Sequence, residues 1–175
     1  MLIGPIVVLT LRILVPLLIF RRPLLGAIAA LIIDALDVVI LDVINLGHFS
    51  NYHELDKYLD IYYLGIEFFV SLKWTNLISR NTGIFLFVFR LVGVILFEIT
   101  KLRILLFIFP NLFENFFIFV LVYKKFFKRE IRNVRELLII LTVLLIPKMV
   151  QEYILHFAEA KPWNFIKESF LGIKS

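Results

Sequence analysis

The sequence contains no cysteine, so disulfide bonds, thiolate catalysis and thiolate metal sites are excluded. Histidine is scarce as well: there are three, and His48 and His53 share a loop without the spacing of a zinc site. The motifs HExxH, GxxxxGKS/T, GxSxG and GxGxxG are all absent. No aromatic-interleaved basic motif occurs either, and we expect no nucleic-acid partner.

Apolar residues, in contrast, are abundant. They make up 61% of the chain, 19 residues are phenylalanine, and the mean hydropathy is +0.95. An ordinary soluble domain is roughly 45–50% apolar. We therefore predict an all-α, polytopic membrane helix bundle, a multi-pass integral membrane protein made of one domain. The net charge of +5 then reflects orientation and contact with anionic lipid.

Apolar segments of about 20 residues, the length of a transmembrane helix, recur along the chain. The first has neither a basic n-region nor a small-residue cleavage site, which predicts a retained helix rather than a signal peptide. Residues 161–175 start with Lys-Pro and carry one apolar face, which predicts an interfacial amphipathic helix. We predict about six transmembrane helices, at residues 1–20, 24–46, 56–74, 83–99, 104–123 and 137–157.

The acidic residues of the first half all lie within residues 34–67. This stretch contains seven acids and a single base, Lys57. A carboxylate inside a bilayer is costly unless a partner, a metal ion or water compensates it. Helical spacing places the acids in two stripes, one on the second predicted helix (Asp34 and Asp37, with Asp42 on the flank) and one on the third (Asp56, Asp60 and Glu67).

Carboxylates that repel each other at close range need a divalent cation, basic partners or raised pKa values. We therefore expect an intramembrane cation site between the two stripes. His53, in the connecting loop, is a further polar group that could support the carboxylates. Arg12 and Arg90 lie inside the first and fourth predicted helices. Each is interpreted either as a structural counter-charge or as a ligand for a substrate phosphate.

The aspartate spacing resembles that of a known enzyme family. Asp34-x-x-Asp37, then Asp56-x-x-x-Asp60 on the next helix, resembles the CDP-alcohol phosphatidyltransferases, which are six-helix membrane enzymes that use Mg²⁺ or Mn²⁺. Their signature is D-x-x-D-G-x-x-A-R followed by G-x-x-x-D-x-x-x-D. Residues 10–16, TLRILVP, also look like the family's first helix, so the resemblance covers roughly the first 60 residues. The chain departs from the signature at both glycines and at the Ala-Arg pair, with Val38, Tyr52, Leu41 and Asp42 in their places.

The resemblance implies a metal-dependent lipid enzyme. Mg²⁺ or Mn²⁺ would neutralise the diphosphate of a CDP-linked lipid. Asp60 would act as base on the acceptor hydroxyl, and Arg12 or Arg90 would hold a phosphate. The implied metal ligands are Asp34, Asp37, Asp56 and Asp60.

Two other classes of function fit the same residues. In a small carrier, the carboxylates would bind a cation or relay protons along the second and third helices. In a non-enzymatic membrane subunit or scaffold, the acids would pair with Arg12, Arg90 and Lys73 and fix helix packing. Such a protein would form a homo-oligomer or part of a membrane complex.

Residues 124–136 are strongly basic, with six bases and two acids. We expect this segment to contact anionic lipid headgroups. With six spans it lies on the more basic side, which the positive-inside rule places in the cytoplasm, and both termini then lie on the opposite side. The six bases are Lys124, Lys125, Lys128, Arg129, Arg132 and Arg135.

Overall fold

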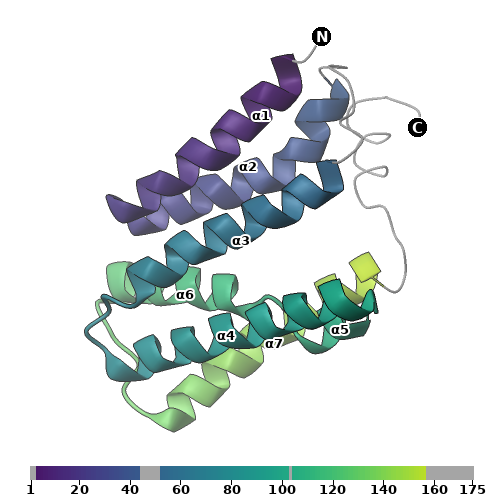
Figure 1. Cartoon of the computed structure of the whole chain (residues 1–175). Helices are drawn as coiled ribbons and strands as arrows, with labels where there is room; N and C mark the ends of the chain where they lie inside the picture. The colour runs from purple at the N-terminus through teal and green to yellow at the C-terminus, as the bar shows by residue number, and fades with distance from the viewer. Residues whose placement is uncertain (1–2, 44–51, 103, 157–175) are drawn as a thin grey trace. The chain divides into compact units, whose positions relative to one another are not determined.

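A computed structural model of the chain describes the backbone of residues 3–43, 52–102 and 104–156, and the side chains of residues 6–36, 58–102, 104–151 and 153. The described residues form helices and short connections and contain no strand, which confirms the all-α prediction (Figure 1). In chain order the elements are α1 (Ile3–Leu14), the 3₁₀-helix η1 (Val15–Phe20), α2 (Pro23–Val43), α3 (Tyr52–Ser71), α4 (Leu77–Thr100), α5 (Ile104–Ile108), α6 (Leu112–Phe127) and α7 (Val134–His156).

The chain divides into two compact units, Met1–Val70 and Ser71–Ser175. In the first unit, α1 and α2 run antiparallel with α3 beside them (Figure 1). The turn between η1 and α2 is tight: a Cβ atom at Gly26 would lie 2.4 Å from the backbone nitrogen of Ile19, so only glycine fits. Two tyrosines on α3 donate hydrogen bonds to the neighbouring helices, Tyr62 to the Ile13 carbonyl on α1 (3.0 Å) and Tyr63 to the Ala27 carbonyl on α2 (3.4 Å).

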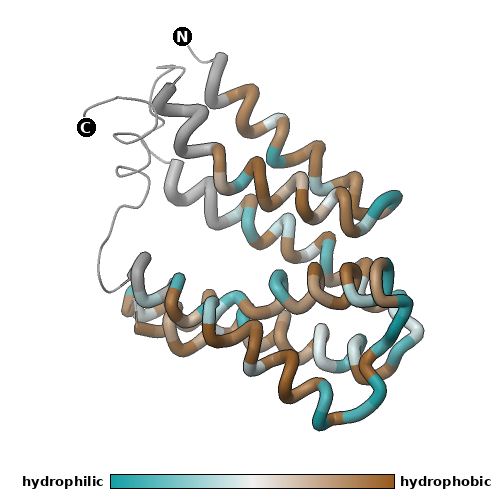
Figure 2. The backbone as a smooth tube through the Cα atoms, turned by 180° about the vertical axis from the view of Figure 1, so that it is seen from behind, coloured by the Kyte–Doolittle hydropathy of each residue, from teal (hydrophilic) through white to brown (hydrophobic). Residues whose placement is uncertain are grey.

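The second unit is organised around aromatic side chains. Phe113, Phe116 and Phe117 on α6 are fully buried, and Phe113 packs edge-on against Phe87 of α4. α5 and α6 are separated by a break at Pro110, inside the single helix predicted at residues 104–123. In Figure 2 the helices of this unit are mostly hydrophobic, and hydrophilic runs gather in its connections.

Several boundaries differ from the sequence-based expectation. The first predicted helix changes from α-helix to 3₁₀-helix after Leu14, where Pro16 lies in the first turn of η1. The fourth begins at Leu77 rather than at residue 83, because the Asn76 side chain accepts a hydrogen bond from the Ser79 N–H and caps it. The predicted interfacial helix at residues 161–175 lies outside the described residues.

Two helical stretches among the described residues are long and apolar enough to cross a membrane. They are Leu77–Thr100 and Ile104–Phe127, the second of which contains the break at Pro110. Ile6–Phe20 and Pro23–Leu36 are apolar but shorter. These stretches agree with a membrane location, and the number of six spans stays a prediction.

Candidate functional site

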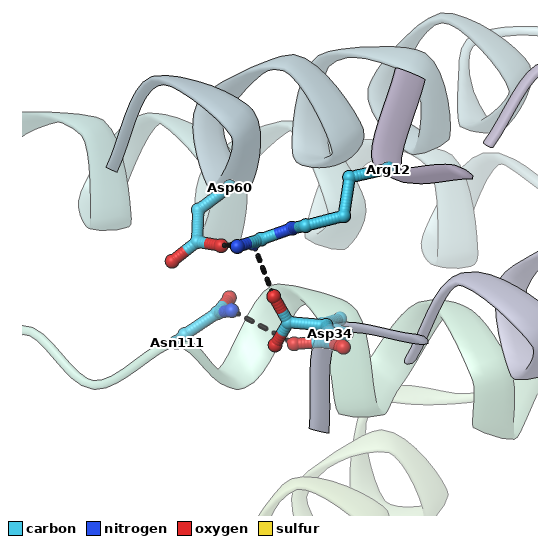
Figure 3. Close-up of polar contacts among 5 residues, drawn as sticks. Arg12, Asp34, Asp60 and Asn111 are labelled. Carbon is cyan, nitrogen blue, oxygen red and sulfur yellow. Dashed lines mark hydrogen bonds and ion pairs between the residues drawn. The ribbon is translucent and has the colours of Figure 1, made fainter. Parts of the chain in front are cut away.

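Arg12 is the centre of the polar site in the first unit. It lies in the last turn of α1, and only 5% of its side chain is exposed. One guanidinium nitrogen, Nη2, donates hydrogen bonds to Oδ1 of Asp34 on α2 and, over 2.6 Å, to Oδ1 of Asp60 on α3 (Figure 3). Three successive α-helices therefore converge on a single cation.

The local sequence explains why these residues meet. The chain reverses at Arg21 and Arg22, whose backbone N–H groups both donate to the Leu18 carbonyl. Arg12 and Asp34 lie 22 residues apart, about equally far from this turn, so the α1–α2 hairpin brings them opposite each other. The Tyr62 and Tyr63 hydrogen bonds described above hold α3 alongside and place Asp60 at the same level.

The two carboxylates are far more accessible than the arginine. The side chains of Asp34 and Asp60 are 42% and 50% exposed, compared with 5% for Arg12. Hydrogen bonds between ionised groups are about twice as strong as neutral ones, so both aspartates restrain the arginine firmly. The three side chains together carry one positive and two negative charges. Their sum of −1 lies next to apolar helix surfaces.

A small cavity of about 10 Å³ adjoins Arg12 and Asp34. Arg12, Asp34 and the Tyr63 side chain form its polar wall, and the rest of its lining is apolar. This volume accommodates about one water molecule. The cavity can therefore hold a water that bridges the polar groups, and a nucleotide is too large for it.

The remaining predicted site residues of the first half are placed less completely. Glu67 is fully buried on α3, two helical turns after Asp60. The side chains of four others, Asp37, Asp42, Asp56 and His53, lie outside the described residues, although their backbones belong to α2 and α3. The structure thus brings together Arg12, Asp34 and Asp60, and does not describe the other half of the predicted metal-ligand set.

Arg90 belongs to the second unit, on α4. Its guanidinium donates a 2.9 Å hydrogen bond to the Phe109 carbonyl. That carbonyl immediately precedes Pro110, at the break between α5 and α6. The described contact of Arg90 thus satisfies a backbone group at a helix break, which is a structural role.

Among the described side chains, no group of three or more histidine, aspartate or glutamate residues is arranged to hold a metal ion. Asp34 and Asp60 supply two carboxylates, which is an incomplete coordination set for Mg²⁺ or Mn²⁺. Asp37 and Asp56 lie about one helical turn away on the same two helices. They are the residues that would complete the set.

A second polar cluster, which the charge pattern did not predict in detail, lies where α6 connects to α7. Glu136 accepts hydrogen bonds from the Tyr123 hydroxyl (2.8 Å) and the Arg132 N–H (2.9 Å), and its own N–H donates to Asn133. Both accepted hydrogen bonds lower the pKa of Glu136: the Arg132 N–H is the largest cause, followed by the Tyr123 hydroxyl. Asn133 and Glu136 have the spacing of a helix capping box, a sequence signal that would have located this cluster.

The comparisons with known proteins add no relative. No family model matches the chain, and neither a curated protein nor a solved structure matches it. The resemblance of the aspartate spacing to the CDP-alcohol phosphatidyltransferases therefore stays a prediction.

Proposed function

We propose that this chain is a multi-pass integral membrane protein with a cation-binding site built on α2 and α3. Asp34 and Asp60 form the described part of the site, and Arg12 is its internal counter-ion. The membrane location is supported by the apolar composition and by the two helical stretches long enough to span a bilayer. The other predicted membrane spans are proposed on the sequence alone.

The observation that carries the proposal is that one buried arginine holds two half-exposed aspartates. A purely structural pair needs only one carboxylate for each arginine. Two carboxylates that lie close together in apolar surroundings are expensive, and this cost favours uptake of a cation. Because Asp34 and Asp60 are exposed and Arg12 is not, an incoming cation would meet the carboxylates first.

A divalent ion fits this site only with the help of neighbouring aspartates. Mg²⁺ prefers six oxygen ligands and commonly keeps several waters, so one or two carboxylates besides Asp34 and Asp60 complete the set. Asp34 and Asp60 would bind it together with Asp37 and Asp56. When bound, such an ion would neutralise phosphate charge. The hypothesis that this chain is a CDP-alcohol transferase requires that neutralisation. Arg12 would then be released from at least one aspartate.

Thermal unfolding of the detergent-purified chain with and without Mg²⁺ or Mn²⁺ tests the proposal. A ligand present at one hundred times its Kd stabilises the folded state by about 2.7 kcal/mol, which corresponds to a Tm increase of about 5–10 °C for a chain of this size. We expect this increase in the native chain and its loss in the Asp34→Asn/Asp60→Asn variant. A further increase in Tm on adding a CDP-linked lipid would support the transferase hypothesis.

The matched control is Glu98→Gln, which also replaces a carboxylate by an amide. Glu98 is exposed on α4 and pairs with Lys101, so its replacement leaves the Arg12 site intact. This variant should respond to the metal ion as the native chain does. If the native chain shows no response to either ion, the cation site is refuted.

A membrane subunit or scaffold is the second candidate. It is favoured by the deep burial of Arg12 at the point where α1, α2 and α3 meet. In that case Arg12, Asp34 and Asp60 only fix helix packing. The same variants would then lower stability, and no ion would change their Tm.

A further inference from the structure

A groove lies between the end of α6 and the start of α7, both in the second unit. Its volume is about 380 Å³, within the usual range for small-molecule sites. One wall is apolar, formed by Phe119 on α6 and by Ile139 and Ile140 on α7. The end near the α6–α7 connection is polar, with Tyr123, Asn133, Arg135 and Glu136. The groove thus has the amphipathic division of a lipid molecule.

Basic residues outnumber acids around the polar end of the groove. Its one acidic lining residue, Glu136, interacts electrostatically with Arg132 and Arg129, and Glu130 forms a 2.7 Å ion pair with Lys124. The segment holds six bases and two acids, so an excess of positive charge remains. Arg135 is exposed on the first turn of α7. An anionic group is therefore the favoured occupant of this end.

The groove also lies where a membrane surface is expected. The apolar stretch Ile104–Phe127 ends one residue before Lys128, the first residue of the connection to α7. Phe126 and Phe127 are 67% and 63% exposed, and Lys124 and Lys125 stand beside them in the last turn of α6. Aromatic and basic side chains at the end of an apolar helix are typical of the level of the lipid headgroups.

We propose that this groove binds one anionic phospholipid, with its headgroup phosphate on Arg135 and an acyl chain against Phe119, Ile139 and Ile140. The proposal rests on the membrane location proposed above, and it is independent of the cation site on α2 and α3. It is more specific than general attraction of the basic segment to anionic lipid, because it assigns one lipid to one groove. Displacement of either half of the lipid should weaken its binding.

Native mass spectrometry of the full-length chain in detergent micelles tests this proposal. The probes are phosphatidylglycerol, which is anionic, and phosphatidylcholine, which has the same chains and no net charge. We expect one tightly bound phosphatidylglycerol. Arg135→Gln should weaken its binding by about tenfold, the usual effect of losing one charge-assisted hydrogen bond.

Three controls make the result specific. Arg22→Gln removes an exposed arginine from the first unit and should leave lipid binding unchanged. Ile139→Trp fills the groove at an exposed position and should block the lipid even if Arg135 is intact. Equal Tm values for the variants and the native chain would show that they are folded.

Inorganic phosphate distinguishes a lipid site from a simple anion site. At millimolar concentration it should not displace phosphatidylglycerol, because it lacks the acyl chain that fills the apolar wall. The proposal is overturned if phosphatidylcholine binds as tightly as phosphatidylglycerol, if phosphate displaces the lipid, or if Arg135→Gln binds the lipid as the native chain does. Loss of metal stabilisation in the aspartate variants would leave the lipid result unaffected, so the two proposals fail separately.

Discussion

Arg12 differs from the other predicted polar residues because its guanidinium bonds to carboxylates on two different helices, α2 and α3. The sequence places it in the middle of an apolar segment, where an arginine must find a carboxylate or reach the membrane surface. The structure selects the first alternative, since Asp34 and Asp60 both contact Nη2. The side chains of its nearest partners remain half exposed, and this exposure separates the site from an ordinary buried ion pair.

Replacement of Arg12 by glutamine should destabilise the first unit. Breaking a buried pair by removing one partner typically costs about 3–5 kcal/mol, and the half-exposed aspartates place this case at the lower end. The triple variant Arg12→Gln/Asp34→Asn/Asp60→Asn should recover part of the loss, because it leaves no carboxylate without its cation. Equilibrium unfolding in detergent measures both. A single variant as stable as the native chain would contradict the role assigned to Arg12.

Glu136 should make the connection between α6 and α7 sensitive to acid. Its hydrogen bonds from Arg132 and Tyr123 lower its pKa below the ordinary value of 4.5. Because the folded pKa is depressed, the stabilisation is fully present above about pH 4.5 and is lost as the pH falls through the folded pKa. Hydrogen exchange of the Arg132 amide should therefore accelerate below that pH, relative to amides in the middle of α4. In Glu136→Gln this pH dependence should disappear, and if it persists another group is responsible.

Among the secondary-structure elements, the turn from η1 into α2 determines which residues meet Arg12. Gly26 is required there, because a Cβ atom would lie 2.4 Å from Ile19 N and 2.7 Å from the Leu18 carbonyl carbon. Gly65 on α3, in contrast, is a helical glycine with free space around it, because a Cβ atom there would meet nothing within 4 Å. The two glycines thus form a matched pair for testing close packing against helix propensity.

Gly26→Ala should lower the stability of the chain, and Gly65→Ala should leave it unchanged or raise it. An alanine inside a helix is favoured over glycine by about 0.8–1.0 kcal/mol, which is the whole effect expected at Gly65. At Gly26 the backbone clash outweighs this gain. Thermal unfolding of the two variants checks the prediction. If Gly26→Ala unfolds at the same temperature as Gly65→Ala, the turn is not as close as described.

The helical pattern of the sequence predicted that the described elements are helices, and their boundaries less well. The apolar runs sufficed to predict helices. The early start of α4 was missed because its cap, Asn76 with Ser79, stands in a polar segment without apolar periodicity. The change to 3₁₀-helix after Leu14 was also missed, because hydrophobicity does not distinguish helix types and only Pro16 marks it.

Of the predicted site residues, Arg12, Asp34 and Asp60 meet in the structure, and the predicted metal-ligand set stays a prediction. The stripes of acids identified Asp34 and Asp60 as facing residues, and one of the two interpretations of Arg12 was pairing with a carboxylate. Periodicity could not show that a single arginine serves both, because that depends on the register of the α1–α2 hairpin. For Arg90 the described partner is a carbonyl at a helix break. The sequence does not contain that information, since the break brings the carbonyl to α4 only in the folded unit.

On the scale of the whole molecule, the membrane topology is the property that most needs a test. The chain has no cysteine, so single cysteines can be introduced as unique labels. Thr75 precedes α4, Leu102 follows it, and the Asn76 side chain donates a 2.9 Å hydrogen bond to the Ile131 carbonyl in the α6–α7 connection. Labels at Thr75 and Lys128 should therefore lie on one side of the membrane, and a label at Leu102 on the other.

Labelling of Thr75→Cys, Leu102→Cys and Lys128→Cys with a membrane-impermeant maleimide checks this arrangement. In intact inverted and right-side-out vesicles, the first and third variants should react from the same side and the second from the opposite side. By the positive-inside rule we expect the side shared by Thr75 and Lys128 to be cytoplasmic. Reaction of all three from one side would show that α4 does not cross the membrane.

Mn²⁺ titration followed by electron paramagnetic resonance shows whether the aspartates around Arg12 bind a cation. The signal of free Mn²⁺ falls when the ion binds, so the titration counts sites without relying on activity. We expect saturable binding to the native chain and to Glu98→Gln, and tighter binding to Arg12→Gln because its carboxylates have lost their internal counter-ion. Asp34→Asn/Asp60→Asn should not bind the ion. Equal Mn²⁺ binding by the native chain and by the double aspartate variant would contradict the proposed cation site.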